Sequence, residues 1–410
     1  MKSKPLGPIP AGYEALDGEL AIGGLTASEL VERGGSTPCF VYSRVHLDKR
    51  VADLRAALPA RIGLNYAVKA NPHTDVIAHM APLVDGFDIA SAGELSMLQA
   101  QQIDARRISF AGPGKRDDEL EAAIDAGVTL NCESHGEAER ALKIAERVAK
   151  QPRIAIRVNP SFELKGSGMK MGGGAKPFGV DADQVPELAR HVIGQGAEWR
   201  GLHIFTGSQA LSEEAIIDSQ RNILKLAGEL SDEIGVTLPK LNLGGGFGIP
   251  YFPNDTALDL APIGSALGDM LKELPAGLAD TQLCLELGRY LVGEAGVYLT
   301  RIIDRKVSHG TTYLVTDGGL HHQLAASGNF GTVVRRNYPL AIASRYECEA
   351  EEVANVVGCL CTPLDRLADL AELPRAEVGD IVAVFCAGAY GASASPSAFL
   401  GQGPAAEFMV

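Results

Sequence analysis

Eight short apolar runs between residues 62 and 287 alternate with longer segments whose apolar residues recur at helical spacing. This rhythm predicts repeated βα units and a parallel sheet, and eight such units are what a (β/α)₈ barrel requires. The predicted strands span residues 62–68, 86–90, 108–111, 128–131, 154–159, 202–205, 241–243 and 283–287. Among the intervening segments, residues 119–126, 136–148 and 213–234 are predicted to be helical.

The sequence changes character after residue 287, where glycine and proline separate short strand-like runs. These runs are residues 297–304, 311–316, 350–357 and 381–385. They predict a second, mainly β domain. Residues 38–42 form a similar run ahead of the barrel, so we expect the first 42 residues to pack with the C-terminal β domain. We therefore predict an α/β protein with a barrel domain at 43–287 and a β domain built from 1–42 and 288–410.

Composition is that of a folded chain with no nucleic-acid or membrane partner. Its 410 residues are 46% hydrophobic and 21% charged, which is enough apolar material for two large cores. The formal net charge of −14 argues against nonspecific binding to nucleic acid, which needs a basic face. The first ten residues lack the apolar stretch of a signal peptide, and no apolar run approaches the roughly 20 residues that cross a bilayer.

The cysteines predict a reduced, cytoplasmic protein without a metal site. There are seven of them, an odd number, and no CxxC pair occurs, so neither a disulfide framework nor a zinc site is indicated. Cys359 and Cys361 form a CxC pair. Without two further ligands, such a pair is poor support for a metal site.

Lys69 stands at the end of the first predicted barrel strand, in the sequence YAVKANP. The preceding apolar residues would bury the lysine stem, and Asn-Pro then turns the chain. A partly desolvated amine loses part of its preference for the charged form, and only a neutral amine attacks an aldehyde. Lys69 is therefore a candidate Schiff-base nucleophile, although a lysine just past a strand is more often a solvated surface charge.

Polar residues and glycines follow the other predicted strands, and the active groups of barrels gather at these C-terminal ends. In chain order they are Asp88, Ser91, Arg157, Asn159, Ser208, Gly244–Gly248, Glu286 and Arg289. The glycine run would let backbone N–H groups approach a phosphate closely, whereas a lone glycine run is more often a flexible turn. Arg289 could add a forked donor and Ser208 a hydroxyl to the same phosphate.

Glu286 ends an otherwise apolar strand, and a buried carboxylate must be paired or protonated. Pairing with Arg289 is one interpretation. The other is that Glu286 meets a protonated ring nitrogen and makes a bound pyridinium a better electron sink. An aldehyde-reactive lysine, a phosphate cradle and such a carboxylate together describe pyridoxal 5′-phosphate.

Eight separated motifs, in this order, resemble those of the fold type III pyridoxal-phosphate decarboxylases, which include the diaminopimelate, ornithine and arginine decarboxylases. They are YAVKAN around Lys69, DIASAGEL from Asp88, RVNP from Arg157, GSQ from Gly207, GGGFG from Gly244, ELGR from Glu286, CTPLD from Cys361 and GAYG from Gly388. The resemblance runs from about residue 30 to residue 410.

The resemblance implies roles for the cofactor-binding residues. Lys69 would bond covalently to the cofactor, and Glu286 would pair with its ring nitrogen. The phosphate would be bound by Gly244, Gly245, Gly246, Ser208, Arg289 and Tyr390. Asp88, Arg157, Phe205 and Gly288 complete the cofactor-binding residues that we predict.

The resemblance also implies a head-to-tail homodimer with shared active sites, in which Cys361 and Asp365 reach the neighbouring subunit's site. We predict Cys361 as a catalytic group alongside Lys69 and Glu286, and Asp365 as a substrate contact. A cysteine is most often an inert buried residue. Cys361, however, stands in a loop with proline and aspartate, and loops are where catalytic groups concentrate.

Three departures from the family pattern bear on the substrate. Phe205 stands where the family has a histidine that stacks on the cofactor ring; a phenyl ring also stacks but donates no proton. His203 is expected to face the other side of its strand, and Leu287 replaces a proline. Residues 328–339 replace the substrate-reading loop of diaminopimelate decarboxylases.

The replaced segment contains Arg335, Arg336 and Tyr338, which we predict to contact the substrate. Two adjacent arginines could bind a distal carboxylate, or they could be solvated charges without a role. Together with the N-terminal PLGPIP, the RRNYP stretch resembles the exosortase A system-associated and siderophore-pathway branch of the family.

The predicted function is pyridoxal-phosphate-dependent decarboxylation of an amino acid, a diamino or dicarboxylic one such as diaminopimelate, lysine, ornithine or a pathway-specific derivative. One alternative is an amino-acid racemase on the same fold, which would use a tyrosine base where this chain has Cys361. Another alternative is a noncatalytic cofactor-binding regulator.

Overall fold

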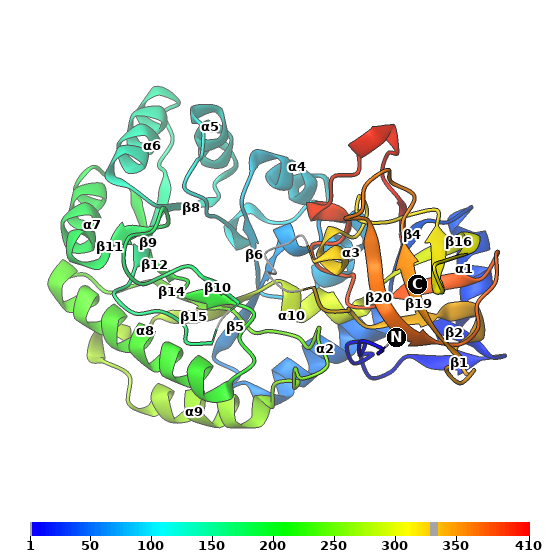
Figure 1. Cartoon of the computed structure of the whole chain (residues 1–410). Helices are drawn as coiled ribbons and strands as arrows, with labels where there is room; N and C mark the ends of the chain where they lie inside the picture. The colour runs from blue at the N-terminus through cyan, green and yellow to red at the C-terminus, as the bar shows by residue number, and fades with distance from the viewer. Residues whose placement is uncertain (1, 167, 329–334) are drawn as a thin grey trace. The chain divides into compact units, whose positions relative to one another are not determined.

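The computed structural model describes residues 2–166, 168–328 and 335–410 (Figure 1). Its contacts divide the chain into two compact units. One consists of Val51–Gly248 and Ala257–Gly288, and the other of Met1–Arg50, Ile249–Thr256 and Arg289–Val410. Whether these units fold as the predicted domains stays a prediction. Within the described residues, no helix has both the length and the apolar character needed to cross a membrane.

Eight parallel strands of the first unit close into a barrel, which confirms the predicted fold. They are β5 (Ile62–Ala67), β6 (Gly86–Ile89), β7 (Ile108–Phe110), β8 (Thr129–Cys132), β9 (Arg153–Asn159), β12 (Glu198–Ile204), β14 (Lys240–Gly245) and β15 (Gln282–Leu287). Each strand pairs with the next in chain order, and β15 pairs with β5 to close the ring. The strands are buried on both faces, as parallel strands covered by helices must be.

Helices follow the strands on the outside of the barrel (Figure 1). They are α3 (Thr74–Met80), α4 (Ala92–Ala100), α5 (Asp117–Ala126), α6 (His135–Arg147), α7 (Val185–Gly194), α8 (Glu213–Ile234) and α9 (Leu260–Lys272). Ser91, Ser134 and Ser212 cap α4, α6 and α8 by accepting a hydrogen bond from a backbone N–H of the first turn. These caps fix the turns at the end of the barrel where the predicted site residues lie.

Three short strands of this unit lie outside the ring of eight. β11 (Val180–Asp181) extends the sheet beside β9, and β10 (Met169–Lys170) pairs with β13 (Gly207–Ser208). The small ladder places Ser208 on ordered backbone directly after β12.

The second unit is mainly β. Its principal sheet has the order β18 (Leu340–Ile342), β21 (Ile381–Val384), β16 (Gly296–Ser308), β17 (Thr311–Thr316), β19 (Glu352–Val357) and β20 (Arg366–Leu373). A smaller sheet holds β1 (Glu14–Leu16), β2 (Glu19–Ile22) and β3 (Leu25–Thr26), followed by α1 (Ala27–Gly34). The helices α2 (Arg44–Ala57) and α10 (Arg289–Val292) lie where the chain passes between the units.

The N-terminal segment is part of this β unit, as predicted. β4 (Cys39–Tyr42) pairs with β16 on one side and with β22 (Ala406–Met409) on the other. One core cluster joins Leu20 and Leu30 to Val297 and Phe385, which are all at most 1% exposed. The hydrophobic core therefore packs the N-terminal segment against the C-terminal part of the chain, although the barrel separates the two in sequence.

Candidate active site

Lys69 lies in a 3₁₀ turn (Val68–Ala70) that follows β5 directly. The hydroxyl of Tyr66 donates to the carbonyl of Asn71 at 2.7 Å and closes this turn. The Lys69 side chain is 44% exposed, and its Nζ lies 3.6 Å from Oε1 of Glu286 and 5.7 Å from the ring centre of Phe205. Three predicted site residues from three strands are therefore brought together.

Glu286 is the charged centre of this group. Its side chain is 5% exposed, and Nε2 of His203 lies 3.0 Å from its Oε2. Burial by itself raises the pKa of Glu286, but the charge of Lys69 and the hydrogen bond from His203 outweigh burial and hold the pKa well below its usual range. Glu286 is thus ionised at neutral pH, with Lys69 and His203 as its partners.

The expectation that His203 faces away from the site is wrong. Side chains two residues apart on a strand share a face, so His203 and Phe205 both point into the barrel, where they meet Glu286 and Lys69. Burial lowers the pKa of His203, although Glu286 opposes this effect. The imidazole of His203 therefore lies against the Glu286 carboxylate inside the barrel. Correct use of strand alternation would have found this residue.

Asp88 is the last residue but one of β6 and is 4% exposed. Burial raises its pKa, and the charge of Glu286 adds to that, so the pKa reaches about 7. Lys240 and Lys69 act in the opposite direction. Two carboxylates at this end of the barrel thus differ in character, since Glu286 is held ionised while Asp88 is protonated up to about neutral pH.

Asp88→Asn is expected to stabilise the cofactor-free protein more at pH 8 than at pH 5. Because the pKa of Asp88 is about 7 when folded and 3.8 as a model value, the folded parent binds an extra proton between these values and loses stability as the pH rises through them. The stability gain of the variant should grow by about 2.5 kcal/mol between pH 5 and pH 8. Urea unfolding at both pH values measures it. A gain that is equal at the two pH values, as expected for the exposed control Asp183→Asn, would contradict the raised pKa.

The glycine run is required by close backbone contacts. Gly244 and Gly246 have φ of +67° and +80°, a conformation that favours glycine. A Cβ on Gly246 would lie 2.3 Å from the carbonyl oxygen of Gly207, and one on Gly245 would lie 2.0 Å from that of Glu286. The end of β14 therefore packs directly against the backbone of Gly207 and Glu286, and the N–H of Gly244 donates to Oδ1 of Asn242 at 2.9 Å. Binding of a phosphate by this run stays a prediction.

Gly288 serves the lysine turn in a similar way. A Cβ at this position would lie 3.0 Å from the Cβ of Ala70 and 3.3 Å from that of Ala67. The glycine thus lets the segment after β15 approach the turn that carries Lys69.

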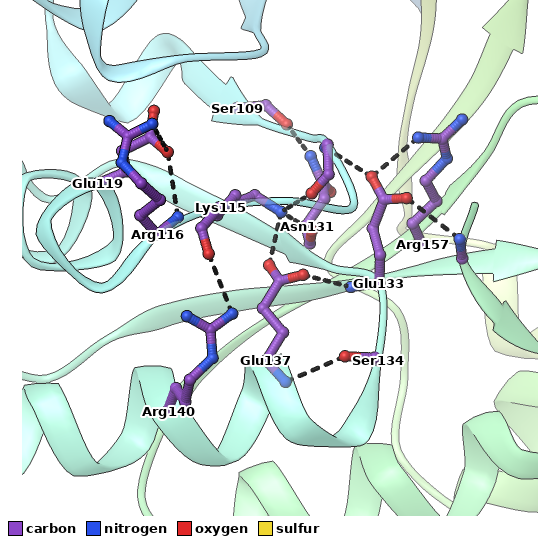
Figure 2. Close-up of polar contacts among 12 residues, drawn as sticks. Ser109, Lys115, Arg116, Glu119, Asn131, Glu133, Ser134, Glu137, Arg140 and Arg157 are labelled. Atoms are coloured by element: carbon purple, nitrogen blue, oxygen red, sulfur yellow. Dashed lines mark hydrogen bonds and ion pairs between the residues drawn. The ribbon is translucent and has the colours of Figure 1, made fainter. Parts of the chain in front are cut away.

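Arg157 is held by a buried carboxylate (Figure 2). Its Nη1 donates to Oε1 of Glu133 at 2.8 Å, and these two side chains are 7% and 1% exposed. Glu133 also accepts from the backbone N–H groups of Gly112 and Gly179. Beside it, Lys115 pairs with Glu137 at 2.5 Å (Figure 2). Arg157 is therefore fixed by the turns after β7 and β8, and its contact with a cofactor stays a prediction.

In the β unit, three predicted residues meet in one aromatic cluster. Nη1 of Arg289 donates to the hydroxyl of Tyr251 at 2.7 Å, and its guanidinium carbon lies 4.9 Å from the ring centre of Tyr390. Tyr338 packs on Tyr251 with ring centres 4.7 Å apart and is 7% exposed. Tyr251 was not predicted from the sequence, because nothing in its local pattern distinguishes it from a core tyrosine.

The loop with Cys361 is shaped by Asp365. Cys361 is exposed, whereas Asp365 is 2% exposed and accepts from the backbone N–H groups of Leu320 and Leu360 at 2.7 and 2.8 Å. Both carboxylate oxygens of Asp365 are thus engaged in holding the loop. This geometry makes Asp365 a positioning residue, and its predicted contact with substrate stays a prediction.

Arg335 and Arg336 have different surroundings. Nη2 of Arg335 donates to the carbonyl of Leu364 at 3.3 Å, in the Cys361 loop. The guanidinium carbon of Arg336 lies 3.6 Å from the ring centre of Phe252. Residues 329–334, which belong to the segment 328–339 that replaces the family's substrate-reading loop, lie outside the described residues.

Comparison with known proteins decides the family. Residues 44–293, more than half of the chain, match the family model described as "Pyridoxal-dependent decarboxylase, pyridoxal binding domain". The chain belongs to this family of pyridoxal-phosphate-dependent decarboxylases. The predicted family, cofactor and carboxy-lyase class are thereby confirmed.

Relatives and solved structures match nearly the whole chain. The chain is 35% identical over 378 residues to the L-glutamyl-[BtrI acyl-carrier protein] decarboxylase of Niallia circulans, and this alignment covers 89% of the chain and 87% of the relative. It is 32% identical over 387 residues to the diaminopimelate decarboxylase of Methanothermobacter thermautotrophicus, covering 92% and 87%. The diaminopimelate decarboxylase of M. jannaschii in co-complex with L-lysine superposes with a TM-score of 0.86 at 25% identity, covering 98% and 93%.

Proposed function

We propose that this decarboxylase acts on a diamino or dicarboxylic amino acid, or on a pathway-specific derivative of one. The observation that carries the proposal is the group formed by Lys69, Glu286 and His203 at the C-terminal ends of the barrel strands, in a chain whose relatives are named for diaminopimelate and for a carrier-bound glutamyl group. The substrates of relatives differ among themselves, and specificity depends on few pocket side chains.

The residues of the barrel fit pyridoxal phosphate. When bound, the cofactor supplies an electron sink for the pair left on Cα as CO₂ departs. In our proposal Lys69 holds the cofactor aldehyde, Glu286 keeps a proton at the ring nitrogen, and His203 holds Glu286 in position. In our proposal the glycine run Gly244–Gly246 also contacts the phosphate, because a glycine backbone can approach an anion without obstruction by a Cβ.

The other predicted residues have supporting roles in this proposal. Phe205 stacks on the cofactor ring, while Ser208, Arg289 and Tyr390 add donors for the phosphate. Asp88, Arg157 and Gly288 shape the surroundings of the lysine and the cofactor. We further propose that Arg335, Arg336 and Tyr338 recognise the distal end of the substrate, as the two guanidinium groups suit a carboxylate.

We propose Cys361 as the proton donor at Cα, acting in the partner subunit's site. Cys361→Ala is expected to lower kcat by about 10²-fold, the lower range for loss of a general acid. The matched control is Cys359→Ser, because Cys359 is half-buried and its thiol donates to the carbonyl of Asp317 at 3.6 Å. Cys361→Ala with unchanged rate and product would overturn the assignment.

A head-to-tail homodimer with shared sites has its own test. If Cys361 and Lys69 act in the same site but come from different subunits, mixing inactive Lys69→Ala with slow Cys361→Ala protein should restore activity in the mixed dimers. Activity that stays at the sum of the two variants would contradict shared sites. We also propose a cytoplasmic location, supported by the seven unpaired cysteines.

The test of the proposed function is CO₂ release by the cofactor-loaded protein. The panel is meso-diaminopimelate, both enantiomers of lysine, ornithine and arginine, carboxylated diamines, and glutamate attached to a carrier protein. Turnover of one member is expected, with no exchange of enantiomers in the absence of CO₂ release. Silence across the panel, with the cofactor bound to Lys69, would refute this substrate class.

A further inference from the structure

A hollow of about 660 Å³ opens at the N-terminal end of the barrel. It is lined by residues at or just ahead of the first positions of neighbouring strands, among them Arg61 before β5, Arg106 before β7, Arg200 in β12 and Lys240 in β14. Its volume lies in the range of small-ligand sites, which is about 300–1,000 Å³. In barrels, this end ordinarily serves stability and not catalysis.

The lining is strongly basic in an acidic protein. Six cationic side chains face the hollow, namely Arg55, Arg61, Arg106, Arg107, Arg200 and Lys240, against the two carboxylates of Asp85 and Asp280. This is an excess of four positive charges in a chain whose formal net charge is −14. Like charges gathered in a concave wall focus a positive potential, which concentrates anions.

Three of these cations are engaged in holding the structure. Arg55 pairs with Asp85 at 2.7 Å. Arg61 donates to three backbone carbonyls near the start of β15, and Arg107 donates to three carbonyls around Asp85. Carbonyl oxygens satisfy the N–H groups of Arg61 and Arg107 but carry no net charge, so both guanidinium groups still contribute to the positive potential.

The other three cations are poorly neutralised. Within the described residues, the side chains of Arg106 and Lys240 form no close ion pair with a carboxylate, although the charge of Lys240 acts on the buried carboxyl of Asp88 and lowers its pKa. Arg200 donates to Glu198 at 3.0 Å, but Glu198 also pairs with Arg153 at 3.2 Å, so one carboxylate serves two guanidinium groups. Nε of Arg200 is buried without a hydrogen-bond partner in the part of the chain that the structure describes.

The inner wall also carries a buried polar group. Asn65 lines the hollow and is 1% exposed, and its side chain forms a hydrogen bond with the buried carboxyl of Asp88. Guanidinium groups bind phosphate and carboxylate through paired N–H donors.

From these observations we infer that the N-terminal end of the barrel is a binding site for a small polyanion, a compound with at least two phosphate or carboxylate groups. The site is distinct from the phosphate cradle of the cofactor. Lys240 begins β14 and Gly245 ends it, and five steps along a strand place the two positions roughly 16 Å apart.

The experiment is calorimetric titration of the cofactor-loaded full-length protein with sodium pyrophosphate and, separately, with sodium citrate. Bound cofactor keeps both probes out of its own phosphate site, and low ionic strength avoids screening. We expect one anion per chain, with the affinity reduced about 10-fold or more by Arg106→Ala and by Lys240→Met, which is about 1.4 kcal/mol. Arg106 is exposed, so its substitution spares the fold. Arg221→Ala, an exposed arginine paired with Asp218 on α8, is the control that should bind as the parent does.

The two probes distinguish the sources of the anion. Binding of pyrophosphate alone would identify phosphate compounds as ligands, and binding of citrate alone would identify polycarboxylates; either result supports the site. If neither probe binds, or if Arg106→Ala and Lys240→Met bind as tightly as the parent, the inference is wrong.

Discussion

Lys69→Ala is expected to lower the rate of decarboxylation by about 10³-fold or more, because both the nucleophile and a mobile proton carrier are lost. The side chain is fixed by a closed turn at the end of β5 and lies 3.6 Å from Glu286. No other lysine of the described residues lies that close to Glu286, so no second amine is placed to replace Lys69. Single-turnover CO₂ release by the loaded variant measures the loss.

A readout besides activity separates loss of chemistry from loss of folding. Borohydride reduction of the parent should fix the cofactor on the peptide that contains Lys69, and this labelled peptide should be absent in the variant. Lys143→Arg, at an exposed position on α6, should leave both the label and the rate unchanged. Retention of the label in Lys69→Ala, or of most of the activity, would refute the assignment.

Glu286→Gln is expected to lower kcat by about 10²- to 10³-fold, the cost of removing one preorganised charge from a dry site. Glutamine keeps the size and still accepts a hydrogen bond from His203, but it cannot hold a proton on a ring nitrogen through its charge. The exposed control is Glu273→Gln. Equal kcat for Glu286→Gln and the parent, with cofactor bound, would contradict the proposed role.

The pH dependence of the parent follows from the same residue. Because the folded pKa of Glu286 is held below its usual range, the stabilisation from its ionised form is present above the unfolded pKa and is lost only as the pH falls through the folded value. The rate should therefore show no titration of Glu286 between pH 5 and pH 8. A loss of activity in this range that Glu286→Gln abolishes would show that the carboxylate titrates there.

Local pattern was sufficient for most of the fold. The buried strands of the barrel are short and apolar, and segments with apolar residues at helical spacing separate them. Both patterns follow from local backbone geometry, because side chains repeat every 2 residues along a strand and every 3.6 along a helix. All eight barrel strands could be predicted, but β20 could not. Arg366–Leu373 has the sequence RLADLAEL, whose Ala, Asp and Glu residues have low strand propensity. It becomes a strand because it pairs with β19.

The sequence by itself determined the barrel, the family and the cofactor, since each follows from local periodicity or from contiguous motifs. Only the tertiary structure decided how distant residues use their charges: His203 turns to Glu286, Asp365 is engaged with backbone amides, and a basic hollow forms at the N-terminal end of the barrel. Burial, pairing and electrostatic potential depend on neighbours far away in the chain, and these neighbours are set when the chain closes into a barrel.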